Sequence, residues 1–77
     1  PDAVRLCPHP GAYDIYDYLS KNKGWKKISE ISSKTGLSVN RVRRIVKYLA
    51  RKGVLNVKWG WRSGKRYPAY VKLRKES

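Results

Sequence analysis

The sequence predicts an α+β fold in which three helices are followed by a two-stranded β-hairpin. Over much of the chain before Gly53, apolar residues recur at three- and four-residue spacings, as they do on the buried side of a helix. After Gly53, apolar and polar residues alternate instead, as they do in a strand with one buried face. The 77 residues leave room for a single domain, residues 1–77, with a small hydrophobic core.

The first predicted helix covers residues 12–22 and follows an irregular lead-in over residues 1–11, which contains three of the four prolines. Its buried stripe consists of Ala12, Ile15, Tyr16 and Leu19. A second helix is expected over residues 28–35, after a short extended link. Gly36 follows it and can adopt the positive φ that ends a helix in a tight turn.

The third predicted helix, residues 38–52, begins at the N-cap residue Ser38 and ends before Gly53. Its buried stripe consists of Val42, Ile45, Val46 and Leu49. The opposite face is polar and consists of Asn40, Arg44, Lys47 and Arg51, with Arg43 on one flank and Arg41 on the other. Exposed helix faces usually include Glu to pair with Lys or Arg, but this helix has no acidic residue. The face therefore suits an anionic partner.

Residues 54–73 are predicted to form the hairpin. The alternating apolar residues are Leu55, Val57, Trp59 and Trp61 in the first strand, and Tyr67, Ala69, Val71 and Leu73 in the second. In a regular ladder the two sets share one face if Arg62 lies opposite Arg66. This register predicts a loop of three or five residues rather than the two-residue turn Ser63-Gly64. Pro68 lacks a backbone N–H, so we expect its strand to be an edge strand or to be bulged there.

The net charge of +14 is distributed unevenly along the chain. All five acidic residues lie outside the stretch 31–75, which holds fourteen of the nineteen lysines and arginines. Solvated surfaces usually mix both signs of charge, whereas this stretch has only one. Such a one-sided field predicts a polyanionic partner.

Several other function classes lack support in the sequence. The single cysteine, Cys7, cannot form an internal disulfide, and Cys7 with His9 supplies only two of the four ligands of a structural zinc site. There is no nucleophile–base or phosphate-loop motif, so we expect neither an enzyme nor a bound cofactor, metal or small-molecule ligand. No apolar run is long enough to span a bilayer, which favours a cytoplasmic protein with no membrane partner.

The order of these elements and one stretch of sequence carry a family resemblance. The stretch ISEISSKTGLSVNRVRRIVKYLARKGVL resembles the winged helix-turn-helix DNA-binding family, and the likeness extends from about Ala12 to Leu73. One departure is Ser32, where the family usually has a small apolar residue. The resemblance implies a three-helix winged helix-turn-helix fold in which the third helix enters the major groove and the hairpin, or wing, touches the flanking backbone or minor groove.

The candidate DNA-binding residues follow from this arrangement. Arg can pair with guanine and Asn with adenine in the major groove, while Lys and Arg neutralise phosphates. The expected contacts are Ser38, Asn40, Arg41, Arg43, Arg44 and Lys47 in the third helix and Arg62, Lys65 and Arg66 in the wing, with weaker backbone contacts from Lys34, Thr35 and Arg51. Ser38 serves equally well as a plain N-cap. Trp59 and Trp61 are expected on the apolar face, in a core or interface role.

The sequence therefore predicts a sequence-specific double-stranded DNA-binding protein that regulates transcription. Three alternatives stay open: a non-specific architectural or replication-associated DNA binder, an RNA- or single-strand-binding module, and a protein-interaction module. A homodimer is possible, with Tyr13 and Tyr18 as candidate contacts. The lack of Gln and Met beside many lysines and arginines is typical of thermophiles, and the chain resembles small regulators of archaeal viruses and plasmids.

Overall fold

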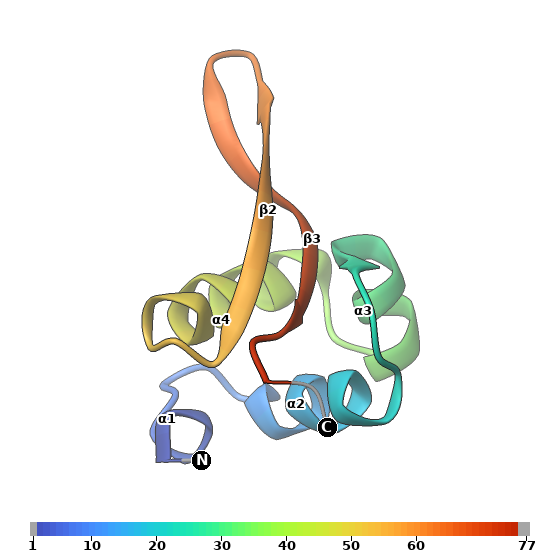
Figure 1. Cartoon of the computed structure of the whole chain (residues 1–77), viewed down its shortest axis with the longest axis vertical. Helices are drawn as coiled ribbons and strands as arrows, with labels where there is room; N and C mark the ends of the chain where they lie inside the picture. The colour runs from blue at the N-terminus through green and yellow to red at the C-terminus, as the bar shows by residue number, and fades with distance from the viewer. Residues whose placement is uncertain (1, 76–77) are drawn as a thin grey trace.

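The computed structural model describes residues 2–75, over which it has four helices and a three-stranded antiparallel sheet (Figure 1). The elements are α1 (Asp2–Arg5), α2 (Ala12–Lys21), β1 (Lys26–Lys27), α3 (Ile28–Thr35), α4 (Val39–Arg51), β2 (Leu55–Arg62) and β3 (Lys65–Leu73). The helices gather around the base of the β2–β3 hairpin, which projects away from them as the wing (Figure 1). The predicted α+β fold with a C-terminal wing is confirmed. No helix within residues 2–75 is long and apolar enough to cross a membrane.

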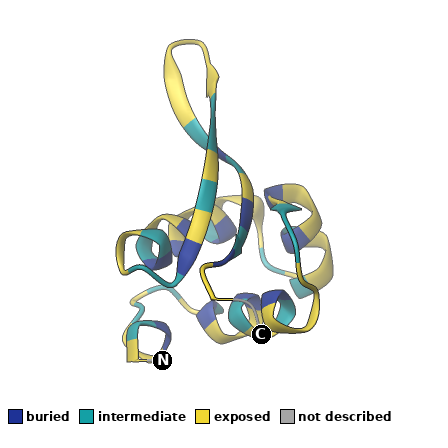
Figure 2. Ribbon diagram, viewed as in Figure 1, coloured by how far each residue is buried: buried dark blue, intermediate teal, exposed yellow. Residues whose placement is uncertain are grey.

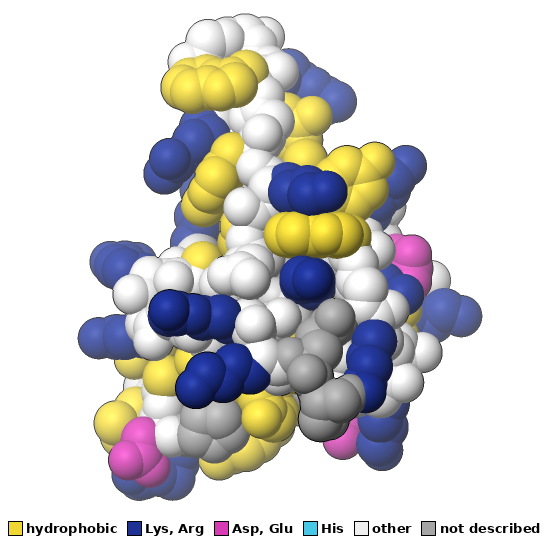
Figure 3. Space-filling model, viewed as in Figure 1, with side chains coloured by type: hydrophobic (Ala, Val, Ile, Leu, Met, Phe, Trp, Pro, Cys, Tyr) yellow, Lys and Arg dark blue, Asp and Glu magenta, His cyan; other side chains and the backbone are white. Residues whose placement is uncertain are grey.

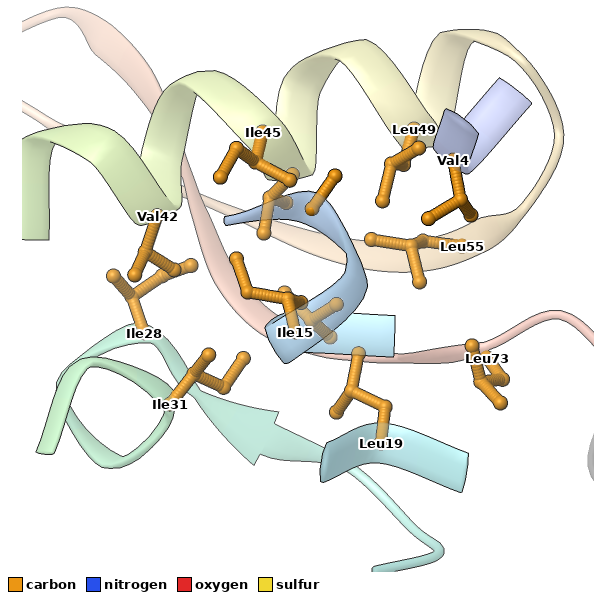
Figure 4. Packing of buried hydrophobic residues seen from close by; sticks show 13 residues of the cluster. Val4, Ile15, Leu19, Ile28, Ile31, Val42, Ile45, Leu49, Leu55 and Leu73 are labelled. Carbon is orange, nitrogen blue, oxygen red and sulfur yellow. The ribbon is translucent and has the colours of Figure 1, made fainter. Parts of the chain in front are cut away.

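The expectation of a wholly irregular lead-in is wrong, because residues Asp2–Arg5 form the short helix α1. Val4 of this helix is only 2% exposed and lies beside Leu49 and Leu55 in the core (Figure 4). A four-residue helix is too short to show a periodic pattern or to be stable alone, so burial of Val4 holds it in place. Cys7, further along the lead-in, is half-buried and packs against the same core.

Helix α3 has the bounds that the sequence predicts, and α2 ends one residue before its predicted end. Gly36 ends α3 at a φ of 76°, the left-handed conformation expected of it. From within α3, the Ser32 hydroxyl donates to the carbonyl oxygen of Leu37 in the turn that follows, at 2.6 Å. The polar residue that departs from the family pattern is therefore hydrogen-bonded where it is partly buried, and it stabilises the turn between α3 and α4.

Helix α4 begins after Ser38, whose hydroxyl accepts a hydrogen bond from the Arg41 backbone N–H at 3.2 Å. Its apolar stripe is fully buried and meets side chains of the other helices and of the sheet (Figure 4). The core consists of Val4, Ala12, Ile15, Leu19, Ile28, Ile31, Val42, Ile45, Val46, Leu49, Leu55, Val71 and Leu73. This packing fixes α4 in rotation, so its polar face must point to solvent.

The sheet has the strand order β1-β3-β2, with β1 paired to Tyr70 and Val71 of β3. At the base of the wing the predicted register is confirmed, since Leu55 lies opposite Leu73 and Val57 opposite Val71. Towards the tip the prediction fails. The connecting turn is the two-residue Ser63-Gly64, and Arg62 lies opposite Lys65 rather than Arg66.

A β-bulge explains how a two-residue turn and the predicted basal register coexist. Lys58 lies opposite Tyr70 but Trp59 lies opposite Pro68, which leaves Ala69 as an extra residue in β3. The bulge is adjacent to Pro68, where we expected an edge or a bulge because proline cannot donate to the ladder. Ser63 and Gly64 have φ values of 52° and 75°, the positive values that a type I′ turn requires. The loop prediction failed because it assumed an unbroken ladder.

Candidate nucleic-acid interface

The polar face of α4 is exposed along its whole length. Asn40, Arg44, Lys47 and Arg51 all lie in solvent, and Arg43 is exposed on the flank nearer to the wing. The Arg43 guanidinium donates to the side-chain oxygen of Asn40 at 3.4 Å, which is longer than a typical hydrogen bond. A base edge can therefore replace this weak contact. The face offers forked and amide donors to one partner without a competing acidic side chain on the helix.

The structure separates Arg41 from this face. Arg41 is half-buried on the other flank of α4, and its guanidinium donates to the Pro10 carbonyl oxygen at 3.4 Å. The lead-in thus lies beside the flank of α4 that carries Arg41. Of the sequence-predicted α4 residues, Arg41 is the one that the structure does not bring together with the rest.

An open groove runs between α4 and the wing, and we call it the α4–wing groove. Six cationic side chains line it, namely Lys27, Arg43, Lys47, Arg62, Lys65 and Arg66. None of the described residues along it is acidic. Charges of one sign on both walls of a groove reinforce each other's field and attract a polyanionic backbone.

The arginines of the wing are supported by aromatic rings. The Arg66 guanidinium lies 4.1 Å from the centroid of the Trp59 ring, and the Arg62 guanidinium lies 5.5 Å from that of Tyr67. Both are cation–π contacts, which restrict these long side chains while leaving them exposed. Arg66 projects on the side of the wing that faces α4, because it pairs with Trp61 and shares a face with Trp59. Lys65, beside the turn, is exposed.

The residues predicted as weaker backbone contacts, Lys34, Thr35 and Arg51, lie outside the α4–wing groove. Arg51 lines a second groove, between α4 and the base of β2, together with Lys47, Trp59 and Arg66. Lys34 is exposed in the last turn of α3. The Thr35 hydroxyl is already engaged, since it donates to the Ile31 carbonyl at 2.7 Å and accepts from the Leu37 N–H at 3.3 Å. Thr35 therefore serves the turn between α3 and α4.

The described acidic side chains belong to α1, α2 and α3, and three of them contact residues of the helical part of the chain. Asp17 pairs with Lys21 at 3.2 Å, and Asp2 pairs with Arg5 at 3.4 Å. The Glu30 carboxylate accepts a hydrogen bond of 2.7 Å from the Tyr18 hydroxyl. This hydrogen bond, with smaller contributions from burial and from the charge of Glu30, raises the pKa of Tyr18 above its usual value of 10.0. The fifth acidic residue, Glu76, lies outside the described residues.

A family model described as winged helix-turn-helix DNA-binding matches residues 12–56, which run from the start of α2 into β2. These residues make up more than half of the 77-residue chain. The chain belongs to the winged helix-turn-helix DNA-binding family. Within this winged helix, α3 and α4 are the two helices of the helix-turn-helix.

A solved structure from Methanosarcina mazei Go1, described as a possible transcriptional regulator, has a similar fold. It superposes on this winged helix with a TM-score of 0.63 at 23% sequence identity. The alignment covers 94% of this chain and 59% of the archaeal one, so the present chain spans little more than half of that protein. None of the curated protein sequences compared with the chain matches it significantly. The likeness to the archaeal structure supports the fold.

Two features of the winged-helix interface differ from what the sequence predicts. Lys27 lines the α4–wing groove because β1 pairs with β3, whereas the sequence makes Lys26 and Lys27 only weaker candidate contacts, since exposed lysines are common. Trp61 was expected with Trp59 on an apolar face, but it is 71% exposed near the tip of the wing. The alternation of β2 places both tryptophans on one face, yet the core ends before it reaches them (Figure 2).

Proposed function

We propose that this winged helix binds double-stranded DNA in a sequence-specific manner and regulates transcription. The observation that carries the proposal is the acid-free α4–wing groove, which is bounded by the exposed polar face of α4 and by the basic tip of the wing. The major groove of B-DNA admits an α-helix, and the phosphates beside it can then lie in the α4–wing groove.

The proposed roles differ along α4. Asn40 and Arg44 stand on the outward face, where base edges lie when a helix is in the major groove, so they read bases. Arg43 and Lys47 line the α4–wing groove and neutralise the adjacent phosphates. Ser38 at the helix N-terminus, Lys34 and Arg51 add backbone contacts at the edges.

In the wing, Arg62, Lys65 and Arg66 follow the backbone into the neighbouring minor groove, which attracts inserted cations where it is narrow. Arg66 is also close enough to α4 to border both grooves between the two elements. Regulation of transcription is supported by the description of the archaeal structure with the same fold.

The test is selection of bound sequences from a random duplex pool, with the wild type and with the variants Arg44→Ala and Arg62→Ala. We expect a short motif from the wild type, a relaxed motif with Arg44→Ala, and weaker binding to all sequences alike with Arg62→Ala. Lys23→Ala is the matched control, because it removes one exposed cation outside the groove.

The outcomes separate the alternatives. If the pool yields no motif and binding collapses with salt, the protein is a non-specific architectural binder. If the wild type does not retain duplex DNA even at low salt, the proposal is wrong.

A further inference from the structure

Trp61 is the most exposed of the large apolar side chains, and it stands near the tip of the wing. It is 71% exposed, although an indole offers a large apolar surface that folding usually buries. Residues 61–66 are all exposed, so this part of the hairpin has no core to which Trp61 could contribute. The side chain therefore adds little to the stability of the fold, and its exposure indicates that it contacts a binding partner.

The surroundings of Trp61 indicate what that partner is. Arg66 lies opposite Trp61 in the ladder, Arg62 follows it in sequence, and both line the α4–wing groove. Figure 3 shows apolar surface at the upper end of the wing with basic side chains nearby. An apolar protein partner would have to accept these cations at its contact, whereas the phosphates of a nucleic acid would neutralise them.

We infer that Trp61 inserts its indole as a wedge between two base pairs of the minor groove. This inference rests on the proposed binding of duplex DNA and adds to it a deformation of the duplex. Apolar side chains inserted between base steps unstack them partially and kink the DNA towards the major groove. Pyrimidine–purine steps, above all TA, unstack most readily. The wing would therefore select a flexible step through the energy of deformation, without reading the edges of its bases.

The position of Trp61 fits a wedge better than a platform for a free strand. Binders of single strands place several aromatic rings along a basic track. Here Trp59 is covered by Arg66, and Trp25 on the other face of the sheet has Lys58 at 4.5 Å and Lys72 at 5.1 Å from its ring centroid. These rings hold cations, which leaves Trp61 as the wing tryptophan available for insertion.

The experiment uses a duplex of alternating A and T, about 30 base pairs or three helical turns long, closed by G·C pairs. Several adenines are replaced by 2-aminopurine, whose fluorescence rises when it unstacks. Because TA steps recur throughout, every binding register places the wing beside one. Affinity is followed on the same duplex by the anisotropy of a dye at its end.

The variants are Trp61→Ala, which removes the wedge, Trp61→Leu, which keeps an apolar wedge without an aromatic ring, and Trp61→Phe. Tyr13→Ala is the matched control, because Tyr13 is an aromatic residue that is 56% exposed on α2, outside the α4–wing groove. All variants should have the same thermal melting temperature as the wild type, since the side chains of Trp61 and Tyr13 are largely exposed.

We expect the fluorescence to rise on binding of the wild type, Trp61→Leu, Trp61→Phe and Tyr13→Ala, but not of Trp61→Ala. The affinity of Trp61→Ala should fall roughly 10- to 150-fold, the range for losing the burial of one large apolar side chain. If the wild type binds without unstacking, or if Trp61→Ala unstacks the duplex equally, the wedge is refuted while DNA binding stands. If Trp61→Phe retains the signal and Trp61→Leu loses it, the ring stacks on a base and the wedge is again refuted. Failure of the wild type to bind this duplex even at low salt, where non-specific binding is strongest, would count against the proposed function.

Discussion

Replacing Arg66 by Gln tests whether the α4–wing groove is the surface that meets the phosphates. Six cations line the groove, and each neutralised phosphate contributes about −0.9 to the slope of log affinity against log salt concentration. The wild type should therefore show a slope of about −5, which corresponds to a loss of roughly 10³-fold in affinity between about 50 and 200 mM salt. Arg66→Gln should reduce the magnitude of the slope by about 0.9, so that its loss over the same range is about 3.5-fold smaller.

The assay is fluorescence anisotropy of a labelled random-sequence duplex at several salt concentrations, for the wild type, Arg66→Gln and the control Lys23→Ala. Lys23 is exposed outside the groove, so its removal should leave the slope unchanged. Equal slopes for the wild type and Arg66→Gln would refute the assignment of Arg66 to a phosphate. An equal decrease in both variants would show that overall charge, rather than the groove, governs binding.

Substitutions at four further positions test how the fold supports the interface. Gly11→Ala should destabilise the protein by about 1–3 kcal/mol in thermal melts, because Gly11 has a φ of 105° and a Cβ there would lie 2.7 Å from Leu37 Cδ1. Gly36→Ala, at a φ of 76° with no atom within 4 Å, should lose less. Ser38→Ala should lower the stability of the protein by about 1 kcal/mol, because the N-cap hydrogen bond of α4 is lost. Ser38→Asp should keep this N-cap but weaken DNA binding, because its carboxylate repels a phosphate. If Ser38→Asp binds DNA as the wild type does, Ser38 acts only as an N-cap. The hydrogen bond to Glu30 raises the pKa of Tyr18 in the folded state, so protonated Tyr18 stabilises the fold fully below about pH 10. This stabilisation is lost as the pH rises through the folded-state pKa. Urea unfolding across that range should therefore show a smaller alkaline loss of stability for Tyr18→Phe, and equal losses would contradict the linkage.

Helices α3 and α4 follow from the sequence because each carries its own apolar stripe and a residue that marks its boundary. Gly36 and Ser38 act through their own backbone or hydroxyl, so nearby residues suffice to predict them. The polar face of α4 is predictable for the same reason, since helical geometry sets it opposite the stripe. Helix α1 is different, because it depends on Val4 meeting Leu49 and Leu55, which lie far along the chain.

The positions of the flanking cations also depend on contacts between distant segments. A helical wheel places Arg41 and Arg43 on opposite flanks of α4, but it does not show that the Pro10 carbonyl oxygen accepts a contact from Arg41 on the flank away from the wing. Lys27 reaches the groove through pairing of β1 with β3. Neither contact leaves a pattern in the residues next to these side chains, so the sequence predicts the charge of the interface better than its outline.

The wing shows how two local rules can disagree and how the chain resolves the disagreement. The Ser63-Gly64 dipeptide favours a two-residue turn, whereas the apolar residues at the base require a register that such a turn cannot give in a regular ladder. The bulge at Ala69 satisfies both, beside a proline that could not donate to the ladder in any case. Its consequence is functional: it places Arg66 opposite Trp61, on the face that carries Trp59, where Arg66 borders the second groove beside α4. The position of the cation that we assign to the phosphates is therefore set by one unpaired residue in β3.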